Sequence, residues 1–279
     1  MQSKMVKTLS TIGGKSRLLK FLIPIMINCI ETNRLVGFID VFGGGNKIIP
    51  NLHCYLHETI YNDIDRGFSN VMMCCSNIDL LQEMIDKAYQ YQFNIDTEEK
   101  FEYACRLRLN PSISIVDSAA LTIIVQSFSR AADRKNYSKS DAKRGISYES
   151  LQRFKELYPS MSNTTVLCTD YKNVLELYKN RSDFLIYLDP PYYGTNSYEN
   201  NIDHVELAES IVESSAYIIL SNFDNPIYEE ILVNSGWNKY SLGVIAKSSS
   251  AKRGSIQQEF IWSNFPIPDY LLPQFNIFE

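Results

Sequence analysis

Residues 183–192 (DFLIYLDPPY) combine a short apolar run with an acid, two prolines and a tyrosine. A continuous run of apolar and aromatic residues this short is typical of a strand buried in a sheet. Proline lacks a backbone N–H and cannot continue a central strand, so the strand is expected to end at Asp189. The structural alternative is a rigid exit from the strand with a capping aspartate. Because proline is an uncommon residue, the string from Asp189 to Tyr192 is too rare to arise readily by chance, and it is a candidate site.

Other stretches of the chain have the same strand-like character. They are residues 36–42, which run into Gly43-Gly44-Gly45, and residues 59–63, 165–170, 216–222 and 259–264. Helical patterns fall between them, at residues 68–88, 203–214 and 226–235. Strands that alternate with helices predict an α/β fold with a largely parallel sheet. Several of the strands end in polar residues, and the ligand crevice of such a sheet lies at those carboxyl ends.

The spacing of the predicted strands is uneven. About 140 residues separate Gly45 from Asp189, whereas two or three βα units of about 30 residues each would need fewer than about 100. The surplus, between about Phe93 and Ser162, contains few strand-like runs and much helix-like sequence. We therefore predict a sheet domain made of residues 1–75 and 163–279, with an inserted, mainly helical domain at residues 76–162.

The composition of the chain bears on its cellular location and on whether it has a metal site. The most apolar early run, Leu18 to Ile30, contains Lys20, Pro24 and Asn28 and is not expected to span a membrane. The polar N-terminus has no signal-peptide pattern, which predicts a cytoplasmic protein. The six cysteines form no CxxC pair and the three histidines are scattered, so we predict reduced thiols and no metal site.

Charge is distributed unevenly along the chain. The net charge of −5 argues mildly against a nucleic-acid partner, since phosphate binding favours a basic surface. Seven basic and three acidic residues lie between Arg130 and Arg153, which gives a local charge of +4 against −9 for the rest. A second basic patch covers residues 247–254. Solvated loops explain either patch equally well. The candidate nucleic-acid contacts are Arg130, Arg134, Lys135, Lys143, Arg144, Lys252 and Arg253.

A glycine loop, a long helical insertion and then D-P-P-Y follow one another in an order that resembles the Dam-type (alpha-group) DNA adenine-N6 methyltransferases. The resemblance covers most of the chain. It implies a Rossmann-like sheet that binds S-adenosylmethionine, an inserted target-recognition domain, and double-stranded DNA as the partner. A lone glycine turn or a lone acid is weak support, but their order before D-P-P-Y makes the combination strong.

The resemblance assigns cofactor contacts to several segments. In the family's G-G-K element, Lys15 would help to hold the methionine carboxylate, and Asp63 after the second strand would accept the ribose hydroxyls. The glycine loop would approach the methionine moiety closely because it carries no side chains. The cofactor-binding residues implied are Gly13, Lys15, Phe42, Gly44, Asp63, Asp170, Tyr171 and Asp189.

The same resemblance makes Asp189, Pro190 and Tyr192 the catalytic residues. The adenine N6 amine is a poor nucleophile because its lone pair is delocalised into the ring. Acceptance of its two hydrogens by the Asp189 carboxylate and the Pro190 carbonyl would draw it toward sp³ geometry. Tyr192 would offer a face for a base flipped out of the duplex.

The chain departs from the family pattern at two places, and other functions stay open. Asn46 replaces the last glycine of the loop; asparagine tolerates a positive φ, but its side chain is expected to crowd the cofactor. Thr11-Ile12 stands where an aromatic residue usually precedes G-G-K. The alternatives are a methyltransferase for cytosine N4, RNA or a protein amide, and a catalytically silent DNA-binding or cofactor-sensing protein. The recognition sequence, the oligomeric state and any restriction partner are open.

Overall fold

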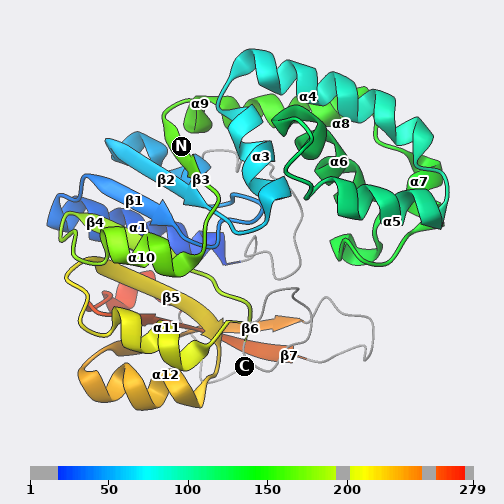
Figure 1. The fold of residues 1–279 in the computed structure, drawn as a ribbon. Helices are drawn as coiled ribbons and strands as arrows, with labels where there is room; N and C mark the ends of the chain where they lie inside the picture. Colours follow the sequence, from blue (N-terminus) through cyan, green and yellow to red (C-terminus); the bar gives the residue numbers. More distant parts are fainter. Residues whose placement is uncertain (1–17, 193–201, 247–255, 274–279) are drawn as a thin grey trace. The chain divides into compact units, whose positions relative to one another are not determined.

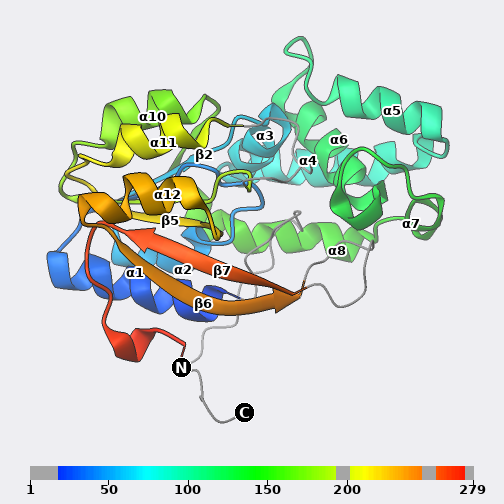
Figure 2. The ribbon, with the colours of Figure 1, turned by 90° about the horizontal axis from the view of Figure 1, so that it is seen from below.

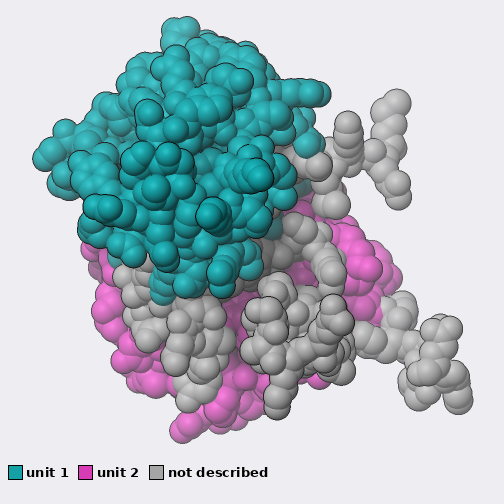
Figure 3. All heavy atoms as spheres, turned by 90° about the vertical axis from the view of Figure 1, so that its right-hand side faces the viewer, with its two compact units in different colours: residues 1–14, 43–53, 59–169 teal, residues 15–42, 54–58, 170–279 magenta. Residues whose placement is uncertain are grey.

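The computed structural model describes residues 18–192, 202–246 and 256–273. These residues divide into two compact units, coloured separately in Figure 3. Residues 43–53 and 59–169 form the first unit, and residues 18–42, 54–58 and 170 onward form the second. The seven strands follow the order β3-β2-β1-β4-β5-β7-β6 in the sheet, which confirms the predicted α/β class.

The second unit contains most of the sheet and the D-P-P-Y segment. Its strands are β1 (Gly37–Asp40), β4 (Phe184–Leu188), β5 (Tyr217–Phe223), β6 (Asn238–Ala246) and β7 (Ile256–Ser263). Strands β1, β4 and β5 are parallel neighbours, whereas β7 pairs antiparallel with both β5 and β6. Strand β4 is buried along its whole length, as its continuous apolar run predicts.

Helices cover both faces of these strands. Helices α10 (Tyr171–Tyr178), α11 (His204–Ile211) and α12 (Pro226–Ile231) lie on one face, and α1 (Leu19–Asn33) lies on the other (Figures 1 and 2). Among the described residues, no helix is long and apolar enough to cross a membrane.

The first unit is mainly helical. It holds the parallel pair β2 (Glu58–Asn62) and β3 (Thr164–Leu167), and the chain between these strands is helical throughout its regular parts. The helices of this segment are α3 (Arg66–Cys75), α4 (Ile78–Tyr91), α5 (Glu98–Leu107), α6 (Ile115–Phe128), α7 (Lys139–Arg144), α8 (Tyr148–Gln152) and α9 (Tyr158–Met161) (Figure 1). The short α2 (Ile49–Leu52) follows the glycine loop. Helix α6 is buried almost all round, since α3, α4 and α5 all pack against it.

Two details differ from the sequence prediction. Residues 68–88 were expected to be one helical stretch, but α3 ends at Cys75 and Asn77 is the N-cap of α4, its side chain accepting hydrogen bonds from the N–H groups of Asp79 and Leu80. Strand β6 was not predicted. Its ladder shifts register between Ser241 and Gly243, and Gly243 has a φ of 98°, so a bulge breaks the alternation by which a strand is recognised.

Gly37 is required for the packing of β1 against β4. A Cβ atom at this position would lie 2.2 Å from Cζ of Phe184, whose fully buried ring also packs against Tyr178 and Arg181. We expect Gly37→Ala to lower the free energy of unfolding by about 1–3 kcal/mol, because the ring has to move in a close-packed core. Urea unfolding monitored by circular dichroism measures the loss.

Phe184→Leu provides the matched test of this explanation. It removes the ring atoms that the new methyl group would meet, so the losses of the two variants should be less than additive when they are combined. Fully additive losses in the free energy of unfolding would mean that a clash with the Phe184 ring does not cause the effect of Gly37→Ala.

Candidate functional site

Three carboxylates of the second unit lie near the phenol of Tyr187. Asp40 is the buried last residue of β1, Asp189 directly follows β4, and Glu259 in β7 is 1% exposed. Tyr187 is buried and its Oη donates to Oγ of Ser221 at 3.2 Å. Burial, and then the charges of Asp189, Asp40 and Glu259, hold the pKa of Tyr187 well above its usual value. Of the three acids, only Asp189 is predicted from the sequence; the signal for the others is a charged residue inside an apolar strand.

Glu259 holds the tyrosine of D-P-P-Y. The Tyr192 hydroxyl donates to Oε1 of Glu259 at 2.6 Å, and its ring meets that of Phe223 edge-on at 4.1 Å between centroids. Phe223 and Glu259 are register partners across β5 and β7. Tyr192 is 7% exposed and Pro190 is buried, so the loop after β4 is fixed at both residues.

The structure brings Phe42 and Tyr171, two of the predicted cofactor-binding residues, into contact; their role stays a prediction. Their ring centroids lie 5.7 Å apart with the planes tilted by 35°. Asp170 is the N-cap of α10, and its carboxylate accepts a hydrogen bond from the N–H of Lys172 at 2.9 Å. Burial, followed by the charges of nearby acids, raises the pKa of Tyr171 to about 12.

In the first unit, the glycine loop is fastened to the end of β2. The N–H of Gly43 donates to the carbonyl of Asn62, and that of Gly44 donates to Oδ2 of Asp63, both at 2.8 Å. The Tyr61 hydroxyl donates to the carbonyl of Gly44 at 2.8 Å, and a Cβ on Gly43 would lie 2.2 Å from the Tyr61 ring. Gly44 has a φ of 46°. The loop therefore needs glycine at one position for space and at the next for backbone conformation.

Asn46 adopts the positive φ expected of it, at 53°. Its side chain is fully buried, and the amide nitrogen lies 2.9 Å from Sδ of Met161 and 3.5 Å from Sδ of Met72. The side chain thus packs into the interior of the first unit, which gives no support to the expectation that it crowds the cofactor.

Asp63 is the central acceptor of the first unit. Its Oδ1 accepts the N–H of Asp65 at 2.7 Å, while Oδ2 accepts that of Gly44. Burial, and then the neighbouring charge of Asp65, raises the pKa of Asp63 to about 6, although the two N–H groups and the charge of Arg134 act in the opposite direction. The carboxylate is therefore ionised at neutral pH and becomes protonated in mildly acidic solution.

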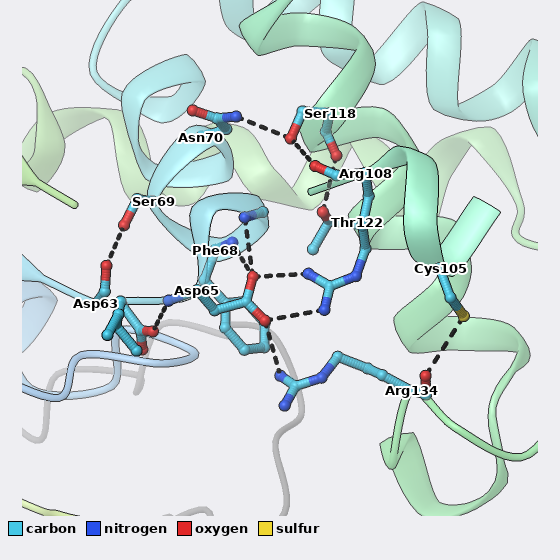
Figure 4. A network of polar contacts seen from close by, with 12 residues as sticks. Asp63, Asp65, Phe68, Ser69, Asn70, Cys105, Arg108, Ser118, Thr122 and Arg134 are labelled. Atoms are coloured by element: carbon cyan, nitrogen blue, oxygen red, sulfur yellow. Dashed lines mark hydrogen bonds and ion pairs between the residues drawn. The ribbon is translucent and has the colours of Figure 1, made fainter. Parts of the chain in front are cut away.

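Asp65, which the sequence analysis missed, carries a buried ion pair (Figure 4). It caps α3 by accepting from the N–H groups of Gly67 and Phe68. Arg108 donates two bonds to it, Nη1 to Oδ1 at 2.6 Å and Nη2 to Oδ2 at 2.9 Å. Burial would raise the pKa of Asp65, but Arg108 and Arg134 outweigh it and hold the pKa below its usual value. An acid just before a helix was the available signal for the cap; none marked the arginines as its partners.

The predicted nucleic-acid contacts of the inserted segment differ in their surroundings. Arg130, Lys135, Lys143 and Arg144 are exposed. Arg134 is largely buried: its guanidinium lies 3.9 Å from Oδ2 of Asp65 and 4.6 Å from the centroid of the Phe68 ring. Its loop is strained, because Ala131, Ala132 and Arg134 itself all have positive φ.

Gly13, Lys15, Lys252 and Arg253 lie outside the described residues, so their predicted roles stay predictions. Within the part of the chain that the structure describes, no cluster of three or more His, Cys, Asp or Glu residues is arranged to hold a metal ion.

Comparison with known proteins identifies the family. No curated protein matches the sequence. The fold is similar to the crystal structure of a SAM dependent methyltransferase from Agrobacterium tumefaciens, with a TM-score of 0.40 and 10% sequence identity, over 88% of this chain and 61% of that chain. This chain thus matches about three fifths of the length of that protein. The model of the D12 class of N6 adenine-specific DNA methyltransferases matches residues 12–234. This match spans most of the chain, which therefore belongs to the D12 class N6 adenine-specific DNA methyltransferase family.

Proposed function

We propose that this protein transfers a methyl group from S-adenosylmethionine to N6 of adenine in duplex DNA, at a base flipped out of the helix. The observation that carries the proposal is D-P-P-Y directly after the buried parallel strand β4, in a chain of this family. Transfer of radioactive methyl groups from the cofactor to DNA, followed by analysis of the modified base, tests it. Methylation of cytosine, of RNA or of protein alone would support the rival methyltransferases, and cofactor or DNA binding without transfer would support the silent homologue.

Each unit, taken by itself, has described residues that suit a part of such a cofactor. The first unit offers an ionised acid, Asp63, beside a glycine turn, which suits ribose hydroxyls and a closely approaching methionine chain. The second unit offers the paired rings of Phe42 and Tyr171, which suit an adenine ring. S-adenosylmethionine supplies an electrophilic methyl group on a positively charged sulfur.

Asp189 and Pro190 act on the adenine amine. The Asp189 carboxylate and the Pro190 carbonyl accept its two hydrogens, which localises the nitrogen lone pair for attack on the methyl carbon. A carboxylate is too weak a base to remove an amine proton beforehand, so proton loss follows transfer, once the nitrogen carries positive charge. Glu259 keeps Tyr192 in place beside this pair through the bond to its hydroxyl.

Asp63→Ala should weaken S-adenosylmethionine binding by about 1–3 kcal/mol, because it removes a charged acceptor from two hydroxyls. Isothermal titration calorimetry at pH 8 measures the change. Asp63→Asn is the matched control: it keeps an acceptor oxygen for the N–H of Gly44 but loses the charge, so it should fall between the wild type and Asp63→Ala. Native affinity in the alanine variant would remove Asp63 from the cofactor site.

Asp189→Ala should reduce the single-turnover rate of DNA methylation by about 10²–10³, the usual cost of losing one contact to developing charge. Asp189→Asn can still present an oxygen, so its loss should be smaller. Cofactor binding, measured by calorimetry, should survive both changes because Asp63 and the glycine loop hold most of that ligand. A near-native rate in the alanine variant would contradict the proposed mechanism.

Neutralising Arg130, Lys135, Lys143 and Arg144 to glutamine should weaken binding to duplex DNA. A basic residue that contacts a phosphate displaces condensed counterions and makes the affinity more dependent on salt. Neutralising each such residue should therefore reduce the magnitude of the slope of log affinity against log salt concentration by about 1. Fluorescence anisotropy between low and moderate salt measures the slope. Lys20→Gln and Lys100→Gln, at exposed lysines outside the basic segment of residues 130–153, are the control. A native slope in the fourfold variant would mean that the cluster is only a solvated surface.

A further inference from the structure

The ion pair of Asp65 and Arg108 is unusually well buried for a charged contact. Arg108 is 1% exposed, and both of its terminal nitrogens donate to Asp65. Removing two charges from water is costly, and the attraction between them recovers that cost only with good geometry. A buried ion pair of this kind often adds little to the free energy of folding, so stability alone does not account for its position in the fold.

The pair is embedded where α3, α5 and α6 meet, as Figure 4 shows. Arg108 is the C-cap of α5, and its carbonyl accepts the Ser118 hydroxyl from α6. Asn70 of α3 donates to the same hydroxyl at 2.8 Å. A Cβ on Gly67 would lie 2.5 Å from Nη1 of Arg108, so a glycine is needed to admit the guanidinium. These contacts leave Arg108 little freedom, so its guanidinium fixes the Asp65 carboxylate in place.

Asp65 is in turn joined to the proposed cofactor acid. Its main-chain N–H donates to Oδ1 of Asp63 at 2.7 Å, and Oδ2 of Asp63 accepts the N–H of Gly44. Arg134, from the loop after α6, approaches Asp65 from a second direction. Arg108 and Arg134 of the helical segment therefore both act on the Asp65 carboxylate. The main-chain N–H of Asp65 in turn orients the Asp63 carboxylate.

We infer that Arg108 and Arg134 are positioning residues for Asp63: Arg108 fixes Asp65, whose N–H aligns the Asp63 carboxylate for the cofactor, and the charge of Arg134 helps to keep that carboxylate ionised. This inference rests on the proposed function, in which Asp63 binds S-adenosylmethionine. It also gives Arg134 a role other than the phosphate contact predicted from the sequence.

The charges around Asp63 set the direction of the expected effect. The groups that face this small cluster are Asp65, Arg66, Arg108, Arg134 and Cys168. Asp65 raises the pKa of Asp63 and Arg134 lowers it, while Arg108 offsets the charge of Asp65. Loss of Arg134 should therefore raise the pKa of Asp63 above about 6. Because the ionised form binds the cofactor, affinity should then be lost at a higher pH than in the wild type.

The test is calorimetric binding of S-adenosylmethionine to the full chain between pH 6 and pH 9. In Arg134→Gln, affinity at pH 6.5 should be about half of its value at pH 8.5, against about three quarters in the wild type, as expected for a rise of roughly half a pKa unit. Arg134→Lys keeps the positive charge and should restore most of the wild-type profile. Lys139→Gln removes an exposed charge from the same basic segment and should leave the profile unchanged.

DNA binding separates this role from a phosphate contact. Arg134→Gln should keep the native dependence of DNA affinity on salt, whereas a fall in slope of about 1 would make Arg134 a phosphate contact and overturn the inference. Arg108→Met, if it folds as judged by circular dichroism, should weaken cofactor binding at pH 8.5, because Asp65, whose N–H orients the Asp63 carboxylate, loses both of its guanidinium donors.

The outcomes distinguish the two proposals. A wild-type protein that does not bind S-adenosylmethionine would refute the proposed function itself. A wild type that binds, combined with an Arg134→Gln variant whose affinity is native or falls equally at every pH, would refute only the positioning role.

Discussion

A carboxylate that accepts hydrogen bonds from two separate stretches of main chain fixes those stretches relative to each other. Asp63 does this for the glycine loop and for the start of α3, through the N–H groups of Gly44 and Asp65. The loop can approach this closely only because Gly43 leaves room for the Tyr61 ring. The start of α3 is held because Asp65 caps the helix with the carboxylate that Arg108 grips. These few bonds set the local geometry around the glycine loop and the start of α3, and the ion pair with Arg108 depends on a charged Asp65.

The sequence predicted the parts of the fold that depend on local pattern. The strands β1, β2, β3, β4, β5 and β7 were confirmed within a few residues, because each is a short apolar run that ends in polar residues or in prolines. Helices α3 to α9 lie in the long interval before Asp189, whose assignment to an inserted domain at residues 76–162 stays a prediction, and the order of motifs correctly indicated the family. Strand β6 was missed because its bulge at Gly243 interrupts the two-residue repeat, and the break at Asn77 was missed because apolar residues continue on both sides of it.

The acidic residues of the candidate site were predictable only where the acid directly follows a predicted strand. Asp63 and Asp189 each follow a strand, and such a place is recognisable without coordinates. Glu259 is distant from Tyr192 in the chain, and only the pairing of β5 with β7 brings the two together. Arg108 is one basic residue among several on a polar helix, so nothing in its neighbourhood distinguishes a buried partner of Asp65 from a solvated side chain. Contacts of this long-range kind depend on tertiary packing, which a local pattern does not encode.

The helical segment between β2 and β3 has a hydrophobic core of its own. Phe101, Leu121, Ile124, Val125 and Phe128 pack together inside it, so its stability does not depend on the residues at its surface. Exposed positions such as Arg130 and Lys135 are therefore free to change in the course of evolution without loss of the fold. Exposed residues of such a segment can be substituted one at a time, while the buried ion pair between Arg108 and Asp65 is kept. The surface of this segment and its buried core are therefore under separate selection within a single chain.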